Sequence, residues 1–316
     1  MKTYNLAAIL LMTLLNCQVY AQQDAQYTQY MYNTLSVNPG YAGSRGVLSF
    51  AGLYRSQWVG LDGSPETQTL NIHSPIGETG RVGLGLSIVN DRIGDGVNEE
   101  TYFDVAFSYT IPTSEKGKLS FGLKGGGHLL NVDFTKLRQF QPELTAADNI
   151  NNKFSPNVGL GVYYHTNKFY LGVSAPNLLE TDHFDESNNS NNAVSFLAEE
   201  RINYYAITGY VFDLNSNVKF KPALLTKIVS GAPLQVDMSA NFMFNNTFIL
   251  GGAYRWDAAV SALAGFQISD SFMLGLAYDK EVTELGGTRF NNGSFEVFLR
   301  FELLKNFEKA VSPRFF

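Results

Sequence analysis

The side chains best suited to acid–base or metal chemistry in this sequence are its four histidines, His73, His128, His165 and His183. The strand pattern described below turns His73 and His128 toward a polar interior, where together they could form half of a metal or acid–base site. No nucleophile or carboxylate pair stands at a spacing that would complete such a site. We therefore interpret these two histidines as polar lining, with His165 at a turn and His183 in an outer loop.

Three other stretches have the composition of a ligand site without its spacing. Residues 90–96 alternate Asn, Asp and Gly as a calcium turn does, but they lack the regular carboxylate frame with a distal Glu, so an Asx or Gly turn is the better interpretation. The runs 83–85 and 125–127 are rich in glycine, yet no helix follows to complete a phosphate loop. Glycine inside a strand more often lets the strand bend or lets an inner segment approach the wall. We expect no cofactor and no metal.

Residues 1–21 combine Lys2, an apolar core and a small-residue end, which is typical of a secretory signal peptide cut before Gln22. The one cysteine, Cys17, lies in this leader, and Asn16 precedes it where a lipoprotein site would have a small residue. The mature chain then has no thiol for disulfides, catalysis or metal binding. We expect the protein to be exported.

The mature chain is mildly acidic, because removing Lys2 leaves 22 basic and 29 acidic residues, a net charge of −7. This balance argues against a nucleic-acid partner. The 17 Tyr and 24 Phe exceed what an ordinary soluble domain carries, but they suit strands with aromatic girdles at two membrane interfaces.

Apolar residues recur at every second position in short segments, most clearly at Phe103, Val105, Phe107, Tyr109 and Ile111. Small, polar or charged residues lie between them, so each segment has one apolar and one wet face. No later stretch reaches the roughly 18 apolar residues of a membrane-spanning helix. The sequence therefore predicts an all-β fold, a 14-stranded antiparallel transmembrane β-barrel of the outer membrane. The expected strands are 46–58, 67–75, 81–90, 101–111, 118–130, 157–165, 168–175, 202–212, 218–228, 234–244, 247–256, 258–268, 271–279 and 294–303.

Connection lengths support this topology, because barrels of this kind have short periplasmic turns and longer outer loops. The even-numbered connections are all short, whereas the odd-numbered set contains the long ones, at 90–100, 131–156, 176–201 and 280–293. Residues 46–303 should thus form the barrel, with both ends in the periplasm. Residues 22–45 are expected to form a short helix or irregular plug in or under the lumen, and residues 304–316 a periplasmic tail.

The polar faces of the expected strands carry charges of both signs. Such charges occur in the eyelet of a selective porin and also in a closed barrel filled by paired residues. Because the signs nearly balance and no constriction loop is identifiable, we favour a filled interior. The charged residues are Arg55, Asp104, Lys124, Asp237, Arg255, Asp279, Glu296, Arg300 and Glu302.

Particular residues, and not only periodicity, resemble a known family. The start 24–33, the segment 38–43, the strand end 54–58, the segments 154–164 and 170–174, and the close 312–316 are similar to the PorP/SprF family of type IX secretion outer-membrane proteins of Bacteroidetes. The resemblance spans essentially the whole mature chain, and Gly40 stands where the family commonly has Ala. The motif residues are Asn38, Pro39, Tyr41, Gly43, Arg55, Gln57, Trp58, Pro313 and Phe316.

The resemblance implies a non-enzymatic outer-membrane component of the type IX secretion and gliding system. Members of the PorP/SprF family accompany large secreted surface proteins and are needed to export them or to hold their C-terminal domains at the cell surface. The implied partners are outer-membrane lipid, the C-terminal domain of an adhesin or other cargo, and periplasmic components of the same machinery. A passive porin or uptake channel is the first alternative. A hydrolase using Asp182, His183 and Asp185 at the mouth is another.

Two of the outer loops, 131–156 and 176–201, hold more apolar residues than solvent exposure alone would favour. These residues could fold the loops over the barrel mouth, or they could form a hydrophobic dock for the C-terminal domain of a secreted protein. The candidate partner-binding residues are Phe134, Leu137, Phe140, Leu178, Leu179, Phe184, Phe196 and Leu197.

Overall fold

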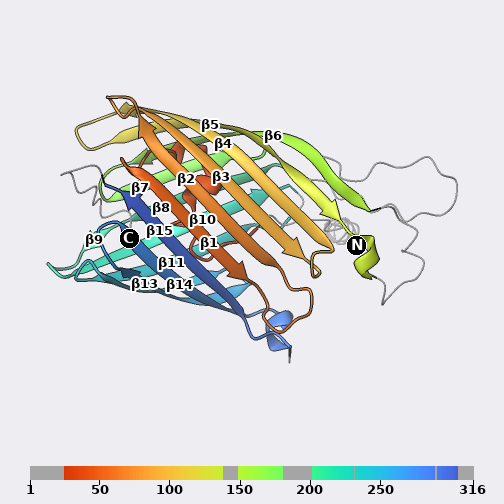
Figure 1. Cartoon of the computed structure of the whole chain (residues 1–316). Helices are drawn as coiled ribbons and strands as arrows, with labels where there is room; N and C mark the ends of the chain where they lie inside the picture. The colour runs from red at the N-terminus through yellow and green to blue at the C-terminus, as the bar shows by residue number, and fades with distance from the viewer. Residues whose placement is uncertain (1–24, 138–148, 181–200, 231, 289, 305–316) are drawn as a thin grey trace, which may run out of the picture.

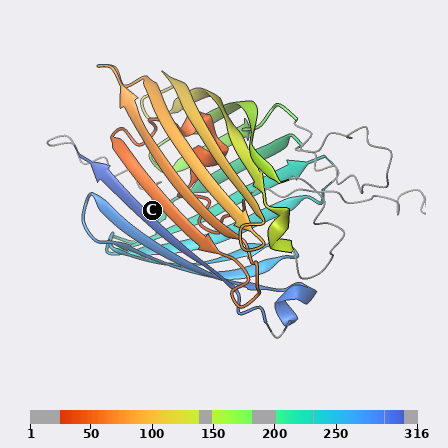
Figure 2. The ribbon, with the colours of Figure 1, turned by 45° about the vertical axis from the view of Figure 1, so that its right-hand side comes forward.

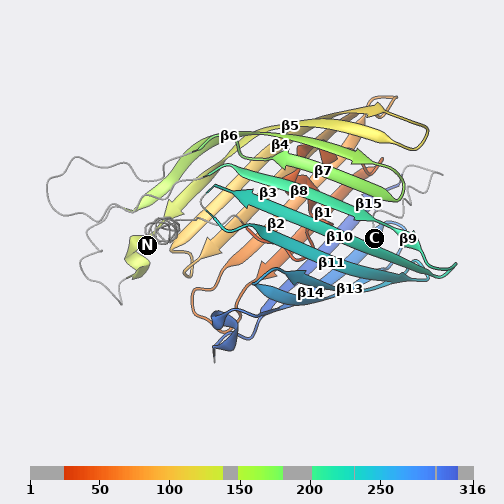
Figure 3. The same cartoon turned by 180° about the vertical axis from the view of Figure 1, so that it is seen from behind.

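The computed structural model describes residues 25–137, 149–180, 201–230, 232–288 and 290–304. Antiparallel strands follow one another around a closed sheet and slant across it, as Figures 1 and 3 show from opposite sides. The strands are β1 Leu48–Ser56, β2 Glu66–Ile76, β3 Val82–Ile93, β4 Asn98–Pro112, β5 Lys118–Val132, β6 Ile150–His165, β7 Phe169–Ala175, β8 Asn203–Tyr210, β9 Phe212–Asp213, β10 Val218–Val229, β11 Gln235–Phe244, β12 Phe248–Arg255, β13 Ala259–Gln267, β14 Phe272–Glu281 and β15 Ser294–Leu303.

The sheet closes because β1 pairs with both β2 and β15, so that Ala51 lies opposite Asn71 on one side and Arg300 on the other. Strands β8 and β9 both pair with β10 in one continuous register and form a single barrel strand interrupted at Val211. Pro222 lies opposite Tyr210 in that register and has no N–H to donate, which accounts for the interruption. The prediction of a closed 14-stranded antiparallel barrel is confirmed.

The alternation of apolar residues with small or polar ones separates the outer face of the barrel wall from its inner face. In β4, Val105 is 59% exposed and Phe107 43%, whereas Ala106 is 4% exposed and Ser108 fully buried. The same pattern repeats around the barrel and leaves a continuous outer belt of large apolar side chains. Exposed apolar surface of that extent is unfavourable in water and is the surface that a bilayer covers. No helix among the described residues is long and apolar enough to cross a membrane.

The longest connections meet at one end of the barrel, named here the long-loop end, and the tight connections at the other, the short-turn end. The prediction of a long loop at residues 90–100 is wrong, because β3 continues to Ile93 and β4 begins at Asn98. Only residues 94–97 turn, with Gly94, Asp95 and Gly96 at positive φ. The expected loop 131–156 is likewise shortened by the extension of β5 and β6.

Residues 25–47 precede β1 and lie between the walls, where Figure 2 shows them in red inside the sheet. They contain one helical turn, α2 Thr34–Val37, and the 3-10 turn η1 Pro39–Tyr41. Their aromatic side chains meet inward-facing aromatic residues of the wall. The Tyr32 ring stacks on Phe298 with centroids 5.1 Å apart, and the Tyr41 ring meets Tyr163 edge-on at 5.3 Å. The apolar core of the described protein therefore lies in the lumen. Residues 25–47 are named the inner segment below.

Candidate functional site

A group of buried charges on three neighbouring strands holds the inner segment near the long-loop end. The Glu296 carboxylate accepts the backbone N–H of Thr28 at 2.9 Å and of Gln29 at 2.8 Å. Asp279 accepts the Thr28 hydroxyl at 2.6 Å. Arg55 Nη1 donates to Asp279 at 2.7 Å, lies 3.3 Å from Glu296, and also donates to the Thr28 hydroxyl. All three charged side chains are almost fully buried, so each relies on the others for its charge compensation.

Closure of the sheet produces this arrangement. Arg55 on β1 lies directly opposite Glu296 on β15, and Asp279 on β14 lies opposite Ser294. The carboxylates therefore come from the last two strands and the cation from the first. We name Arg55, Asp279 and Glu296 the latch, because they bind the backbone and side chain of the inner segment together.

A second attachment lies toward the short-turn end. The Asn38 side chain accepts the N–H of Gly40 at 2.9 Å and donates to the carbonyl of Val162 at 3.1 Å. The Ser108 hydroxyl donates to the Ala42 carbonyl at 2.7 Å, and the Gly43 N–H donates to His73 Nδ1 at 3.1 Å. These bonds satisfy polar groups of an irregular segment that water would otherwise have to reach.

Glycines of the wall give this turn its space. A β-carbon built on Gly122 would lie 2.1 Å from the Gly40 backbone nitrogen, and one on Gly83 would lie 2.2 Å from the Ala42 carbonyl oxygen. Both approaches are far inside van der Waals contact. The expectation that strand glycines admit an inner segment is therefore confirmed at Gly83, and Gly122, outside the two glycine runs singled out in the sequence, has the same role.

Gly122→Val should displace the Pro39–Tyr41 turn and destabilise the barrel by about 1–3 kcal/mol, the range for overpacking a filled interior. Gly125 on the same strand is exposed on the outer face, and a β-carbon there meets no atom within 4 Å. Gly125→Val is thus a matched control that should leave stability unchanged. Urea unfolding of both variants, followed by tryptophan fluorescence, measures the difference. Equal stability of the two would contradict the close approach seen here.

Three further buried charge pairs lie in the lumen, two across the wall and one between the wall and the inner segment. Lys124 Nζ lies 2.6 Å from Asp104, Arg255 Nε lies 2.6 Å from Asp237, and Arg45 of the inner segment pairs with Glu302. The expectation of a filled interior with paired charges agrees with these contacts. Arg255 also donates to the Gln26 side chain at 2.9 Å and to the Tyr27 carbonyl at 3.3 Å.

Two tyrosines of the inner segment use their hydroxyls as neutral hydrogen-bonding groups. The Tyr27 hydroxyl lies 3.0 Å from Thr69 Oγ1, and that of Tyr30 lies 3.2 Å from Ser239 Oγ. Burial raises the pKa of both phenols well above the usual value, so they keep their protons at physiological pH.

The three described histidines contact different partners. His73 accepts a backbone N–H, the His128 ring lies 5.1 Å from that of Tyr102, and the His165 ring lies 5.6 Å from that of Tyr163. Within the described residues no group of three or more His, Cys, Asp or Glu side chains is arranged to hold a metal. Asp182, His183 and Asp185 lie outside the described residues.

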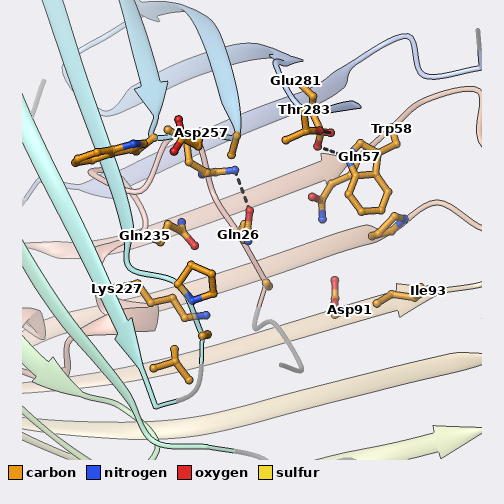
Figure 4. A pocket seen from close by; sticks show the side chains of 18 of the residues that line it. Gln26, Gln57, Trp58, Asp91, Ile93, Lys227, Gln235, Asp257, Glu281 and Thr283 are labelled. Carbon is orange, nitrogen blue, oxygen red and sulfur yellow. Dashed lines mark hydrogen bonds between the residues drawn. The ribbon is translucent and has the colours of Figure 1, made fainter. Parts of the chain in front are cut away.

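A cavity of about 1030 Å³ opens above the inner segment at the long-loop end, and we name it the vestibule. Ala25 and Gln26 of the inner segment line it together with the ends of six strands and residues of the connections at this end. Figure 4 shows Gln26 at the centre, with Trp58 and Glu281 on one side and Lys227 on the other. The lining residues are Ala25, Gln26, Gln57, Trp58, Pro65, Asp91, Ile93, Asn98, Glu100, Lys227, Val229, Ala232, Pro233, Leu234, Gln235, Arg255, Trp256, Asp257, Ala258, Glu281 and Thr283.

The motif residues divide between these places. Asn38, Pro39, Tyr41 and Gly43 belong to the second attachment, toward the short-turn end. Arg55 belongs to the latch, and Gln57 and Trp58 line the vestibule. Pro313 and Phe316 lie outside the described residues. The sequence reasoning missed the vestibule, although Trp58 and Trp256, the only two tryptophans, were a compositional signal for it.

The candidate loop residues are only partly described. The Leu178 N–H donates to the Val158 carbonyl at 2.9 Å, and the neighbouring Leu179 side chain is exposed. The backbone of Phe134 and Leu137 forms the 3-10 turn η2 Phe134–Leu137. Phe140, Phe184, Phe196 and Leu197 lie outside the described residues.

Comparison with curated proteins gives no match. Among solved structures, the chain is similar to the toluene transporter TbuX of Ralstonia pickettii, with a TM-score of 0.46, 10% identity, and coverage of 87% of this chain and 93% of that one. The CymD monoaromatic hydrocarbon channel gives 0.44 and 11%, covering 89% and 94%. The NanC porin gives 0.41 and 9%, covering 81% and 100%.

The family comparison is more specific than these. The model of the type IX secretion system membrane protein PorP/SprF matches residues 19–301, which include the inner segment and all but the end of the last strand. The chain belongs to the PorP/SprF family of type IX secretion system membrane proteins.

Proposed function

We propose that this barrel acts in type IX secretion as a non-enzymatic outer-membrane anchor that binds the C-terminal domain of a secreted adhesin or other cargo. Binding takes place at the long-loop end, which faces the cell exterior in barrels of this class. The membrane location and the secretion system follow from the fold and the family, and the capture of cargo is the proposed step.

The inner segment is the observation that carries the proposal. Most of residues 25–47 are buried in the lumen, and the segment is held at the latch and around the Asn38 turn by hydrogen bonds to seven strands. A solute channel needs a continuous wet path, whereas the inner segment and the buried side chains of the wall occupy the lumen of the described barrel. A filled barrel offers a rigid platform, and rigid scaffolds present recognition loops. The passive porin is therefore the poorer explanation.

The mouth supplies the surface for binding. The vestibule combines two tryptophans with several apolar and amide side chains. Aromatic side chains of this kind are enriched in surfaces that bind other proteins. The candidate loop residues Leu178 and Leu179 lie at the same end and are proposed to extend this surface. The other candidate loop residues belong to the same proposal.

The test is affinity purification of the full-length barrel from outer membranes, with identification of the co-eluting proteins. A large secreted polypeptide is expected, and deletion of residues 181–198 should release it into the medium while the barrel still assembles. Assembly is checked by heat-modifiable migration on gels. Unchanged surface retention after the deletion would contradict the loop part of the proposal, and the absence of any secreted polypeptide would contradict the whole.

A further inference from the structure

Trp58 adopts a backbone conformation that its side chain does not favour. Its φ is +47°, in the left-handed region where a bulky residue is a genuine outlier. The same loop uses glycine for such conformations at Gly60 and Gly63, with φ of +103° and +72°. A glycine at position 58 would satisfy the backbone equally well, so the loop does not need this side chain to turn. Strain of this kind is concentrated at functional sites.

The surroundings hold the indole in one place. The Trp58 backbone N–H donates to Ser294 Oγ at 3.1 Å, and the next residue, Val59, exchanges backbone hydrogen bonds of 2.8 Å with Asn292 and Gly293. The indole Nε1–H donates to the Glu281 carboxylate. The ring is half-buried and lines the vestibule, as Figure 4 shows. An aromatic anchor that is fixed before binding loses little conformational freedom on binding, which is typical of an interface hot spot.

The charges of the vestibule identify the kind of side chain that would lie against this ring. Four carboxylates line the cavity, from Asp91, Glu100, Asp257 and Glu281, against two cations. One of the cations, Arg255, is committed to the Asp237 carboxylate and to the inner segment. The cavity therefore carries a net negative charge.

Glu281 is the carboxylate placed beside the indole. Its two oxygens accept from neutral donors, the Trp58 indole and the Thr283 hydroxyl at 3.1 Å, and each oxygen has further acceptor capacity. An indole face next to a carboxylate is a favourable environment for a lysine or arginine side chain, through cation–π attraction and a charge-assisted hydrogen bond.

We infer that the vestibule takes a basic, extended segment of the secreted partner, with a Lys or Arg side chain seated between the Trp58 indole and the Glu281 carboxylate. The inference rests on the proposed function for the identity of the partner. It adds the site on the barrel, the chemistry of the bound segment and the two residues that anchor it. A cavity of this volume is at the upper end of the range for small ligands and has room for several residues of peptide.

The first test reads the site directly in the purified full-length barrel. With Trp256→Phe, Trp58 becomes the only tryptophan, and its emission is recorded during titration with hexa-arginine or hexaglutamate. A saturable change with hexa-arginine alone is expected, and Glu281→Gln should weaken it about tenfold, the loss expected for one charge-assisted contact. Glu284→Gln, at an exposed carboxylate outside the vestibule lining, is the matched control and should bind as before. No saturable response, or equal weakening by both substitutions, would overturn the inference.

The second test separates this inference from the proposed function in cells. Trp58→Gly suits the local backbone, so the barrel should assemble with unchanged heat resistance, but the polypeptide that co-purifies with the natural barrel should be lost to the medium. Normal retention by W58G would overturn the role of Trp58 and leave the proposed anchor intact. If the natural barrel captures no secreted polypeptide, the proposed function is wrong. The vestibule then cannot be the binding site for a segment of a secreted partner.

Discussion

Replacing Arg55 with alanine is expected to lower the free energy of unfolding by about 3–5 kcal/mol, the usual result of removing one partner from a buried ion pair. Arg55 is 2% exposed and is the cation of the latch, in contact with both Asp279 and Glu296. Without it, two buried carboxylates face each other across adjacent strands with no compensating charge. Their repulsion and desolvation should also loosen Thr28 and Gln29, which bind the same oxygens.

Urea unfolding of the refolded barrel in detergent measures this loss. Lys168→Met is the control, because it removes an ion pair with Asp213 in which both side chains are 43% exposed, and exposed ion pairs contribute little to stability. The combination Arg55→Leu, Asp279→Asn and Glu296→Gln removes all three charges together and should recover most of the stability. An Arg55→Ala barrel as stable as the Lys168→Met control would show that the latch does not hold the inner segment.

The barrel itself was predictable because two-residue periodicity is a local signal. Val105 and Phe107 meet lipid while Ala106 and Ser108 meet the inner segment, so the two solvents impose opposite preferences on neighbouring residues. The prediction failed where that contrast ends. Beyond the bilayer, residues such as Asp91 and Arg92 are polar on both faces, so β3 and β4 continue their ladder without any alternation to reveal it.

The sequence indicated which charged residues face the lumen, but not which of them pair. Parity placed Arg55, Asp279 and Glu296 on the inner face, but which charges pair depends on the register between the first and last strands. That register is set by closure of the whole barrel, with more than two hundred residues between the partners. The sequence of the inner segment has no periodic pattern, because its hydrogen bonds go to groups of the barrel wall and not to the regular ladder of a neighbouring strand.

The vestibule was harder to predict for the same reason. Trp58, Lys227 and Glu281 are distant in sequence and come to line one cavity only when the barrel closes and brings the ends of β1, β10 and β14 around one opening. The inner segment then supplies the floor through Gln26, which Arg255 holds in place. The recognition site proposed above thus depends on the plug, since without a floor the same residues would line the mouth of an open tube.

Deletion of residues 25–43 is accordingly expected to convert a closed barrel into a conducting one. Eight-stranded barrels are filled by their own side chains, whereas barrels of 16–18 strands leave an aqueous channel, and 14 strands lie close to the second group. The inward face left behind would carry Arg55, Asp104, Lys124 and Glu296, which water can hydrate once the lumen opens. These charges then no longer require partners from the inner segment, so the deleted barrel can still assemble.

Planar-bilayer recording compares the natural barrel, the deletion and the Gly125→Val control after refolding in the same detergent. The deletion should give porin-like conductance steps, and the other two should give no resolvable steps. Large steps from the natural barrel would mean that the inner segment leaves a wet path, and the porin alternative would then regain its physical basis. Silence from a deletion that has folded, as judged by heat-modifiable migration, would mean that the wall side chains close the lumen unaided. The inner segment would in that case serve the vestibule as its floor, and loss of hexa-arginine binding on deletion would distinguish this role from that of a seal.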